Sequence, residues 1–190
     1  GFLYAVGEFG GNIELDPTTT LISQGSLDVL VAKYDPNGVL VWTRTFGGPG
    51  LDRAVRIALT SDGNIAVVGQ FMGAASFDGT MLVSQNGTQD MFVLKMAKSD
   101  GTVAWARQGG SRDGVDQPNG VSVGPDGSIA VAGEFRGNAV CDQGTLSSII
   151  DPDNGQPSVD IFLATYASDG TPLWLQQGAA EFADRGMDVV

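Results

Sequence analysis

The acidic residues of one loop are the side chains best suited to bind a metal ion. Asp151-Pro152-Asp153-Asn154-Gly155, followed by Asp160, places several oxygen ligands close together along the chain. Hard cations such as calcium prefer such carboxylate and carbonyl oxygens. The loop lacks the complete Asp-x-Asp-x-Asp-Gly pattern with a distal Glu, which favours a solvated insertion over a dedicated site. Asp151, Asp153 and Asp160 are the candidate calcium ligands, and no other cofactor is expected.

Nucleophilic and zinc chemistry are restricted by the absence of His and the presence of a single Cys, Cys141. Without His the chain cannot form a Ser-His-Asp triad or a His-ligated zinc site. Cys141 takes the repeat position of Leu15 and Phe77, where a free Cys behaves as a small hydrophobe. We therefore predict a buried, unreactive Cys141 and no tightly bound catalytic transition metal.

Carboxylates dominate the remaining polar residues and could in principle supply the acid pair of a glycosidase. No particular pair stands out, however, because most acidic residues occupy turn or repeat positions. Asp is favoured there because its side chain accepts hydrogen bonds from nearby backbone amides. A structural role is therefore predicted for the following residues: Asp16, Asp28, Asp52, Asp62, Asp78, Asp90, Asp100, Asp116, Asp126, Asp142, Asp160, Asp169 and Asp184. The alternative is an acidic surface for a cationic partner.

The net charge of −12 disfavours several classes of partner. Nucleic-acid binding relies on Lys and Arg to neutralise phosphates, so a nucleic-acid partner is not expected. Anionic membrane surfaces are disfavoured for the same reason. No apolar run approaches the length of a membrane span, so membrane insertion is not expected either.

An internal repeat of about 62 to 70 residues is the strongest feature of the sequence. Three blocks recur in fixed order along the whole chain. The first is a glycine-ended apolar segment, the second begins with Asp and runs through a Gly turn to a Trp, and the third contains an Asp. Their copies are Gly1–Phe9, Gly63–Phe71 and Gly127–Phe135; Asp28–Trp42, Asp90–Trp105 and Asp160–Trp174; and Leu51–Arg53, Val115–Gln117 and Ala183–Arg185.

Each block is expected to form a strand. In the second copy we predict strands near residues 53–60, 64–71, 90–97 and 102–108, with an excursion of about twenty residues that can add a hairpin. Continuous apolar runs such as Ile65–Val68 suit strands covered on both faces. Asp-Gly and Asn-Gly pairs between the runs favour tight turns. No helical period is present, and a β-sandwich does not explain a repeat that carries four strands. Four strands per unit is typical of a β-propeller blade.

The predicted fold is therefore all-β, with three four-stranded propeller repeats that form an incomplete ring. We expect strands two to four of a first blade in residues 1–50, a second blade in 51–114 and a third in 115–182. Residues 183–190 are expected to form the first strand of a following or partner blade. Since propellers typically need four to eight blades, we expect two chains to associate head to tail in a six-bladed ring. The alternative is that the chain is an excerpt of one longer propeller.

Several motifs are similar to the bacterial seven-bladed propeller repeat family (SBBP type). They are Gly-Asn-Ile-Ala-Val-Val-Gly at 63–69, the segments 89–95 and 100–105, and the Gly pair at 109–110. The resemblance implies a propeller, usually in secreted or surface-exposed bacterial proteins, without a defined activity. The segment 101–105 also resembles quinoprotein propeller repeats. The third copy departs from the pattern at Thr165 and Ala179 and in an insertion through 149–159.

The leading functional hypothesis is a non-enzymatic module of a secreted or surface bacterial protein that acts as an interaction or structural scaffold. The expected partners are a second copy of the chain and a protein or glycan ligand. An enzyme with its site at the propeller mouth, glycosidase-like or quinoprotein-like, is the alternative. A carbohydrate-binding propeller is a third possibility.

Overall fold

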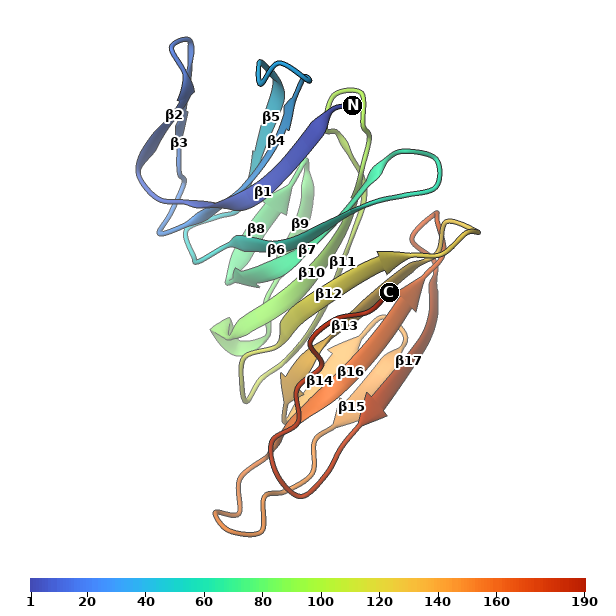
Figure 1. Cartoon of the computed structure of the whole chain (residues 1–190). Helices are drawn as coiled ribbons and strands as arrows, with labels where there is room; N and C mark the ends of the chain where they lie inside the picture. The colour runs from blue at the N-terminus through green and yellow to red at the C-terminus, as the bar shows by residue number, and fades with distance from the viewer.

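The computed structural model describes residues 1–190 and contains almost only strands and turns (Figure 1). A short 3-10 turn, Gln85–Gly87, is the one helical element. The strands are β1 Leu3–Phe9, β2 Asn12–Asp16, β3 Thr19–Ile22, β4 Asp28–Tyr34, β5 Leu40–Phe46, β6 Arg53–Leu59, β7 Ile65–Met72, β8 Ala74–Phe77, β9 Thr80–Val83, β10 Gln89–Met96, β11 Val103–Ser111, β12 Gln117–Val123, β13 Ile129–Arg136, β14 Asn138–Cys141, β15 Gly144–Ser147, β16 Val159–Tyr166 and β17 Pro172–Gly178. The all-β prediction is confirmed.

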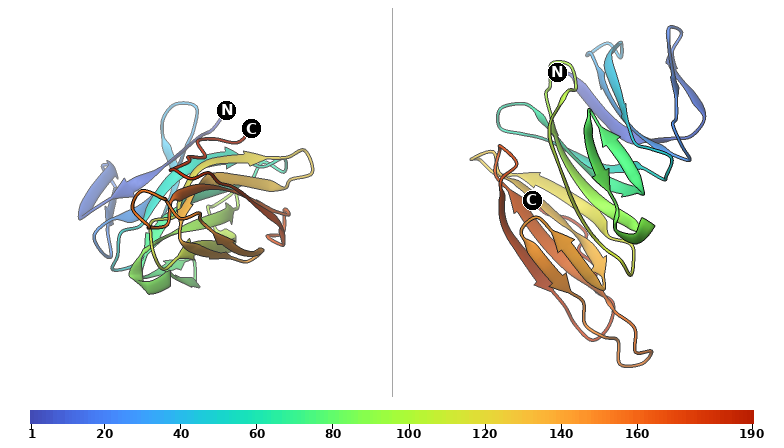
Figure 2. Two further views of the ribbon diagram at one scale, coloured as in Figure 1. Left: turned by 90° about the horizontal axis from the view of Figure 1, so that it is seen from below. Right: turned by 180° about the vertical axis from the view of Figure 1, so that it is seen from behind.

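Three antiparallel sheets follow one another as successive blades, and Figures 1 and 2 show them arranged as a fan. Blade 1 has the strand order β1-β4-β5, and blade 3 has the order β12-β13-β16-β17. Blade 2 has the order β6-β7-β10-β11, and its last strand also pairs with β14. The four strands predicted between residues 53 and 108 are therefore observed. Each blade is a meander, as expected of a propeller repeat.

The central strands of blade 2 are buried on both faces because another blade covers each side. Ile65 and Val67 belong to a core shared with blade 1, where Phe46 packs against Phe77. The alternating residues Ala66 and Val68 belong to a second core shared with blade 3. Successive side chains of a strand point to opposite faces, so two covered faces require the continuous apolar run seen in the sequence.

A small hairpin lies directly before the last two strands of each blade: β2–β3, β8–β9 and β14–β15. The hairpins of blades 2 and 3 each join their blade to the one before it. Gly47 of blade 1 exchanges backbone hydrogen bonds with Ser76 of β8. In the same way, Gly109–Ser111 of blade 2 pair with Ala139–Cys141 of β14. The first strand of the hairpin in blade 2 or blade 3 thus pairs with the end of the last strand of the blade before it.

Residues 183–190 form no strand within this chain, and their assignment to a following or partner blade stays a prediction. The segment nevertheless lies on blade 3 in the expected place. The Asp184 amide donates to the Val159 carbonyl, as Asp52 donates to Leu27 and Asp116 to Gln89. β6 and β12 are strands because each pairs along its length with a second strand, β7 or β13. Residues 183–190 have no such neighbour within the chain, so the anchoring bond is their one backbone–backbone bond to blade 3.

Candidate binding site: the grooves between blades

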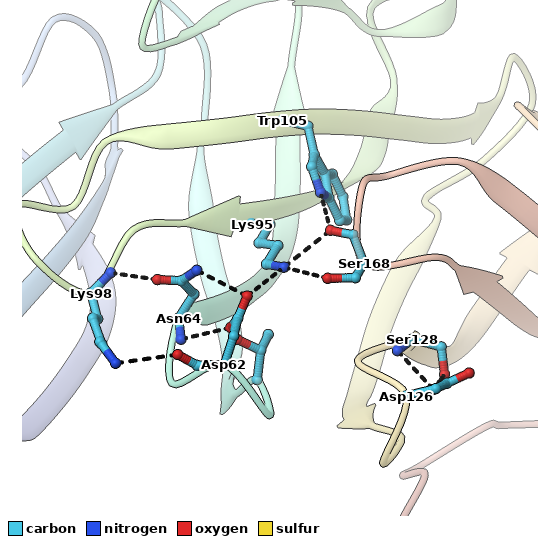
Figure 3. A network of polar contacts seen from close by, with 9 residues as sticks. Asp62, Asn64, Lys95, Lys98, Trp105, Asp126, Ser128 and Ser168 are labelled. Atoms are coloured by element: carbon cyan, nitrogen blue, oxygen red, sulfur yellow. Dashed lines mark hydrogen bonds and ion pairs between the residues drawn. The ribbon is translucent and has the colours of Figure 1, made fainter.

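A cluster of polar side chains joins blade 2 to the turn between the last two strands of blade 3 (Figure 3). We call the turn between the last two strands of a blade its CD turn. Lys95 Nζ donates to the Ser168 carbonyl at 3.1 Å and to its hydroxyl at 2.6 Å. Trp105 Nε1 donates to the same carbonyl at 3.2 Å, and Arg107 Nε donates to the Gly170 carbonyl at 2.8 Å. Three side chains of one blade therefore hold the CD turn of the next.

The same arrangement occurs between blade 1 and blade 2. Lys33 Nζ and Trp42 Nε1 both donate to the Lys98 carbonyl, at 2.7 and 3.3 Å. Arg44 Nε donates to the Asp100 carbonyl at 2.8 Å. The Lys–Trp–Arg set and its target therefore repeat with the blades. The arrangement recognises the carbonyl oxygens of a tight turn, which are unpaired in the turn itself.

Glycine allows the CD turn to lie against the tryptophan ring. Gly101 and Gly170 have positive φ values of 75° and 85°, as a tight turn requires. A Cβ at Gly101 would lie 2.8 Å from the Trp42 ring, and one at Gly170 would lie 2.7 Å from the Trp105 ring. Both distances are shorter than real carbon contacts. Glycine is thus needed here for the turn and for the contact.

Asp62 adds a carboxylate to the groove between blades 2 and 3. Its Oδ2 lies 3.1 Å from Lys95 Nζ, and the two groups form an ion pair. Hydrogen bonds from the Thr60 hydroxyl and the Asn64 amide, followed by Lys95, hold the pKa of Asp62 well below its usual range. The turn aspartates Asp100, Asp126 and Asp169 likewise accept bonds from the residue two positions later, which lowers their pKa values. These contacts agree with the structural role predicted for turn aspartates.

Pairs of buried aspartates lie at the two internal blade junctions. Asp28 and Asp52 form the first pair, and Asp90 and Asp116 form the second; all four are at most 1 % exposed. Each accepts a backbone N–H bond that closes its own loop, for example from Gly48 to Asp52 at 2.8 Å. Asp52 and Asp116 therefore fix the loops that connect one blade to the next, and Asp28 and Asp90 fix the loops that lead from the small hairpin into the following strand of their own blade.

Burial makes these aspartates easier to protonate. It raises the pKa of Asp52 and of Asp90 to about 6, and that of Asp116 to about 7. The neighbouring carboxylate adds to the rise for Asp52 and Asp116. One oxygen of Asp28 and one of Asp116 have no hydrogen-bond partner. A buried carboxylate without a partner favours its neutral form.

The candidate calcium ligands do not come together in the structure. The Asp151 carboxylate accepts bonds from the Asp153 amide and the Asn154 side chain, both at 2.8 Å, within an exposed loop. Asp160 is buried and accepts bonds from the Ile149 amide and the Ser158 hydroxyl. No three acidic, His or Cys side chains of the chain are grouped as a metal site.

Cys141 is partly buried, where full burial was predicted. It lines a small cavity of about 10 Å³, close to the volume that one water molecule needs, together with Asp116 and Gly109. Cys141 is the last residue of β14 and lies between Gly109 of β11 and Gly144 of β15. Burial and the nearby carboxylates raise the pKa of the Cys141 thiol to about 12, which disfavours the reactive thiolate.

From sequence alone the tryptophans were given only as repeat positions, and the Lys–Trp–Arg set was missed. The sequence does contain the repeated pattern. Lys33 and Lys95 stand next to last in β4 and β10, and Arg44 and Arg107 follow two residues after the Trp of their blade. What the sequence alone does not show is that the target carbonyls belong to the next repeat.

No family model matches the chain. It is 29 % identical over 151 residues to the regulatory protein FlaEY of Caulobacter vibrioides, which covers 77 % of this chain and 15 % of that protein. It is 28 % identical over 125 residues to the uncharacterized WD repeat-containing protein L264 of Acanthamoeba polyphaga mimivirus, covering 63 % of this chain and 9 % of that protein. Together with the fold, the second similarity supports a β-propeller-like repeat module. The chain spans less than a fifth of either relative.

Proposed function

We propose that the chain is a non-enzymatic propeller module that serves as a structural or interaction scaffold. The observation that carries the proposal is the repeated use of Lys, Trp and Arg at two successive junctions to hold the CD turn of the next blade. These Lys, Trp and Arg side chains therefore join one blade to the next. The similarity to a WD repeat-containing protein supports the same proposal.

A turnover assay separates this function from the enzymatic alternative. We expect no activity of the purified chain on a panel of chromogenic α- and β-glycosides. We also expect no dye reduction when a pyrroloquinoline quinone, calcium and a primary alcohol are supplied. Turnover that disappears on substitution of a single carboxylate would contradict the proposal. A parallel glycan array tests the carbohydrate-binding alternative.

The location of the module is part of the proposal. The resemblance to repeats of secreted and surface-exposed bacterial proteins supports an extracellular or cell-surface position. The structure contains no helix of the length and hydrophobicity that a transmembrane span needs. Protease accessibility of the tagged full-length protein on intact source cells tests the location, with lysed cells as the control.

A further inference from the structure

A polar pocket lies between the last strand of blade 1 and the hairpin of blade 2. We call it the Thr45 pocket; it has a volume of about 330 Å³. The residues that line it include Gln24, Arg44, Thr45, Phe46, Ser76 and Asp78. This volume is at the lower end of the range for small-molecule sites, so the pocket suits a small ligand.

Contacts within the chain fix the walls of the Thr45 pocket. Gly47 and Ser76 exchange backbone hydrogen bonds of 3.2 and 2.8 Å, which hold β8 against the end of β5. The Gln24 amide donates to the Asp28 carboxylate at 2.7 Å and fixes the loop before β4. The pocket is therefore preformed, and a ligand does not have to order its walls.

A glutamine occupies the corresponding space in blades 2 and 3. Gln108 stands where Thr45 stands and bridges β11 to β9. Its Oε1 accepts from the Val83 amide at 3.1 Å, and its Nε2 donates to the Val83 carbonyl at 3.0 Å. Gln177 makes the same two bonds to Ser147 in blade 3. Thr45 is too short for this bridge, so the space stays open in blade 1.

The Thr45 pocket also keeps two opposite charges apart. Arg107 and Asp142 form an ion pair of 3.4 Å between blades 2 and 3. Their equivalents, Arg44 and Asp78, form no ion pair. Arg44 uses its Nε, and one Asp78 oxygen accepts a backbone N–H bond. The terminal nitrogens of Arg44 and the second oxygen of Asp78 are therefore available to a ligand.

Three uncharged polar side chains of the pocket are available in the same way. The hydroxyls of Thr45 and Ser76 and the side-chain amide of Gln24 make no hydrogen bond within the chain. Gln85, the equivalent of Gln24, donates instead to a backbone carbonyl at 2.5 Å. Hydroxyl and amide groups can both donate and accept. Phe46 adds an apolar wall beside them.

We propose that the Thr45 pocket binds a single neutral sugar ring of a glycan. The neighbouring hydroxyls of a sugar donate and accept at once, which suits a carboxylate, a guanidinium, an amide and two hydroxyls gathered in one pocket. An anionic ligand would meet the Asp78 carboxylate, and a cationic one would meet the Arg44 guanidinium. The inference rests on the proposed scaffold function and deepens it, because it makes a glycan the partner of the scaffold.

An NMR titration of backbone amides with simple sugars tests the proposal. The probes are the methyl glycosides of glucose, galactose, mannose and N-acetylglucosamine. At least one should bind with a dissociation constant of about 1 mM, as expected of a small ligand with a few hydrogen bonds. The largest shifts should lie at Thr45, Ser76 and Asp78. Glycine and L-alanine, which carry both charges, serve as a competing ligand class and should not bind.

Two variants should each weaken sugar binding by tenfold or more. Thr45→Gln gives blade 1 the residue of blades 2 and 3 and fills the pocket. Asp78→Asn keeps a residue that tolerates the φ of 53° and removes the charged acceptor. Asp142→Asn, at the equivalent exposed position of blade 3, is the matched control and should bind as the wild type does. Thermal unfolding shows that each variant is folded.

Three results would overturn the proposal. The first is that no sugar of the panel binds. The second is sugar binding that Thr45→Gln leaves unchanged, because the site would then lie elsewhere. The third is binding of the amino acids in place of the sugars, because the ligand class would then be wrong. None of these results affects the non-enzymatic scaffold function, which the turnover assay tests separately.

Discussion

Glycine at the CD turn shows how much a single position depends on residues far away in the sequence. Asp169-Gly170 predicts a tight turn from sequence alone, because Gly readily adopts positive φ. The second requirement at Gly170, contact with the Trp105 ring, comes from another repeat and is visible only in the structure. The same limit explains why Asp160 was grouped with Asp151 as a calcium ligand. Although the two residues are close in the sequence, Asp160 is buried in β16 and Asp151 lies in an exposed loop.

Substitution of Gly170 measures this contact at the scale of one residue. Gly170→Ala should lower the free energy of unfolding by about 2–3 kcal/mol, because it combines strain at positive φ with overlap against Trp105. Gly155→Ala also strains a positive φ but has nothing within 4 Å, so it should cost only about 1 kcal/mol. Urea unfolding monitored by circular dichroism gives both values. Equal losses for the two variants would mean that the Trp105 contact contributes nothing.

At the scale of elements, the strands were predictable and their partners were not. Continuous apolar runs indicated strands covered on both faces, and β7 and β10 have this environment. The pairing of β14 with β11 was not predicted, because it joins a hairpin to a different blade. Residues 183–190 form no strand within the chain, because a strand needs a paired neighbour as well as a suitable sequence.

Two tryptophans at equivalent positions should respond differently to truncation. Trp105→Ala removes the bond to Ser168 and the contact with Tyr166, whose ring centroid lies 6.0 Å away. It should lower the free energy of unfolding by about 2–3 kcal/mol, below the roughly 3–5 kcal/mol of a fully buried aromatic, because Trp105 is half-buried. Trp174→Ala should lower the free energy of unfolding by less than about 1 kcal/mol, because Trp174 is 47 % exposed. Urea titrations of the two variants give both free energies of unfolding. A greater loss for Trp174→Ala than for Trp105→Ala would contradict this prediction.

At the scale of the whole molecule, the buried aspartates set an unusual dependence of stability on pH. Their pKa values are higher in the folded than in the unfolded chain, so the folded state binds more protons as the pH falls from about 7 towards 4. The free energy of unfolding should therefore increase over that range. Below about pH 4 the exposed turn aspartates, whose pKa values are lowered, become protonated and the stability they contribute is lost.

Asp116 should account for much of this dependence. We expect Asp116→Asn to raise the free energy of unfolding at pH 7.5, by on the order of 2 kcal/mol, and to flatten its rise between pH 7 and 5. Asp113→Asn, at a nearby exposed position, serves as the control and should leave the profile unchanged. Thermal unfolding across pH values, at low concentration to avoid precipitation near the isoelectric point, gives the profiles. A wild-type chain that loses stability steadily from pH 7 to 5 would contradict this account.

The central claim is that three blades pack in succession, with blade 2 covered on both sides. Hydrogen exchange of backbone amides, followed by mass spectrometry, tests it most directly. β7 and β10 each pair with two strands and lie between two apolar cores, so their amides should be the slowest in the chain to exchange. The outer strand β17 pairs on one side only and should exchange orders of magnitude faster. Exchange of β7 and β10 at the rate of β17 would contradict the packed succession of blades.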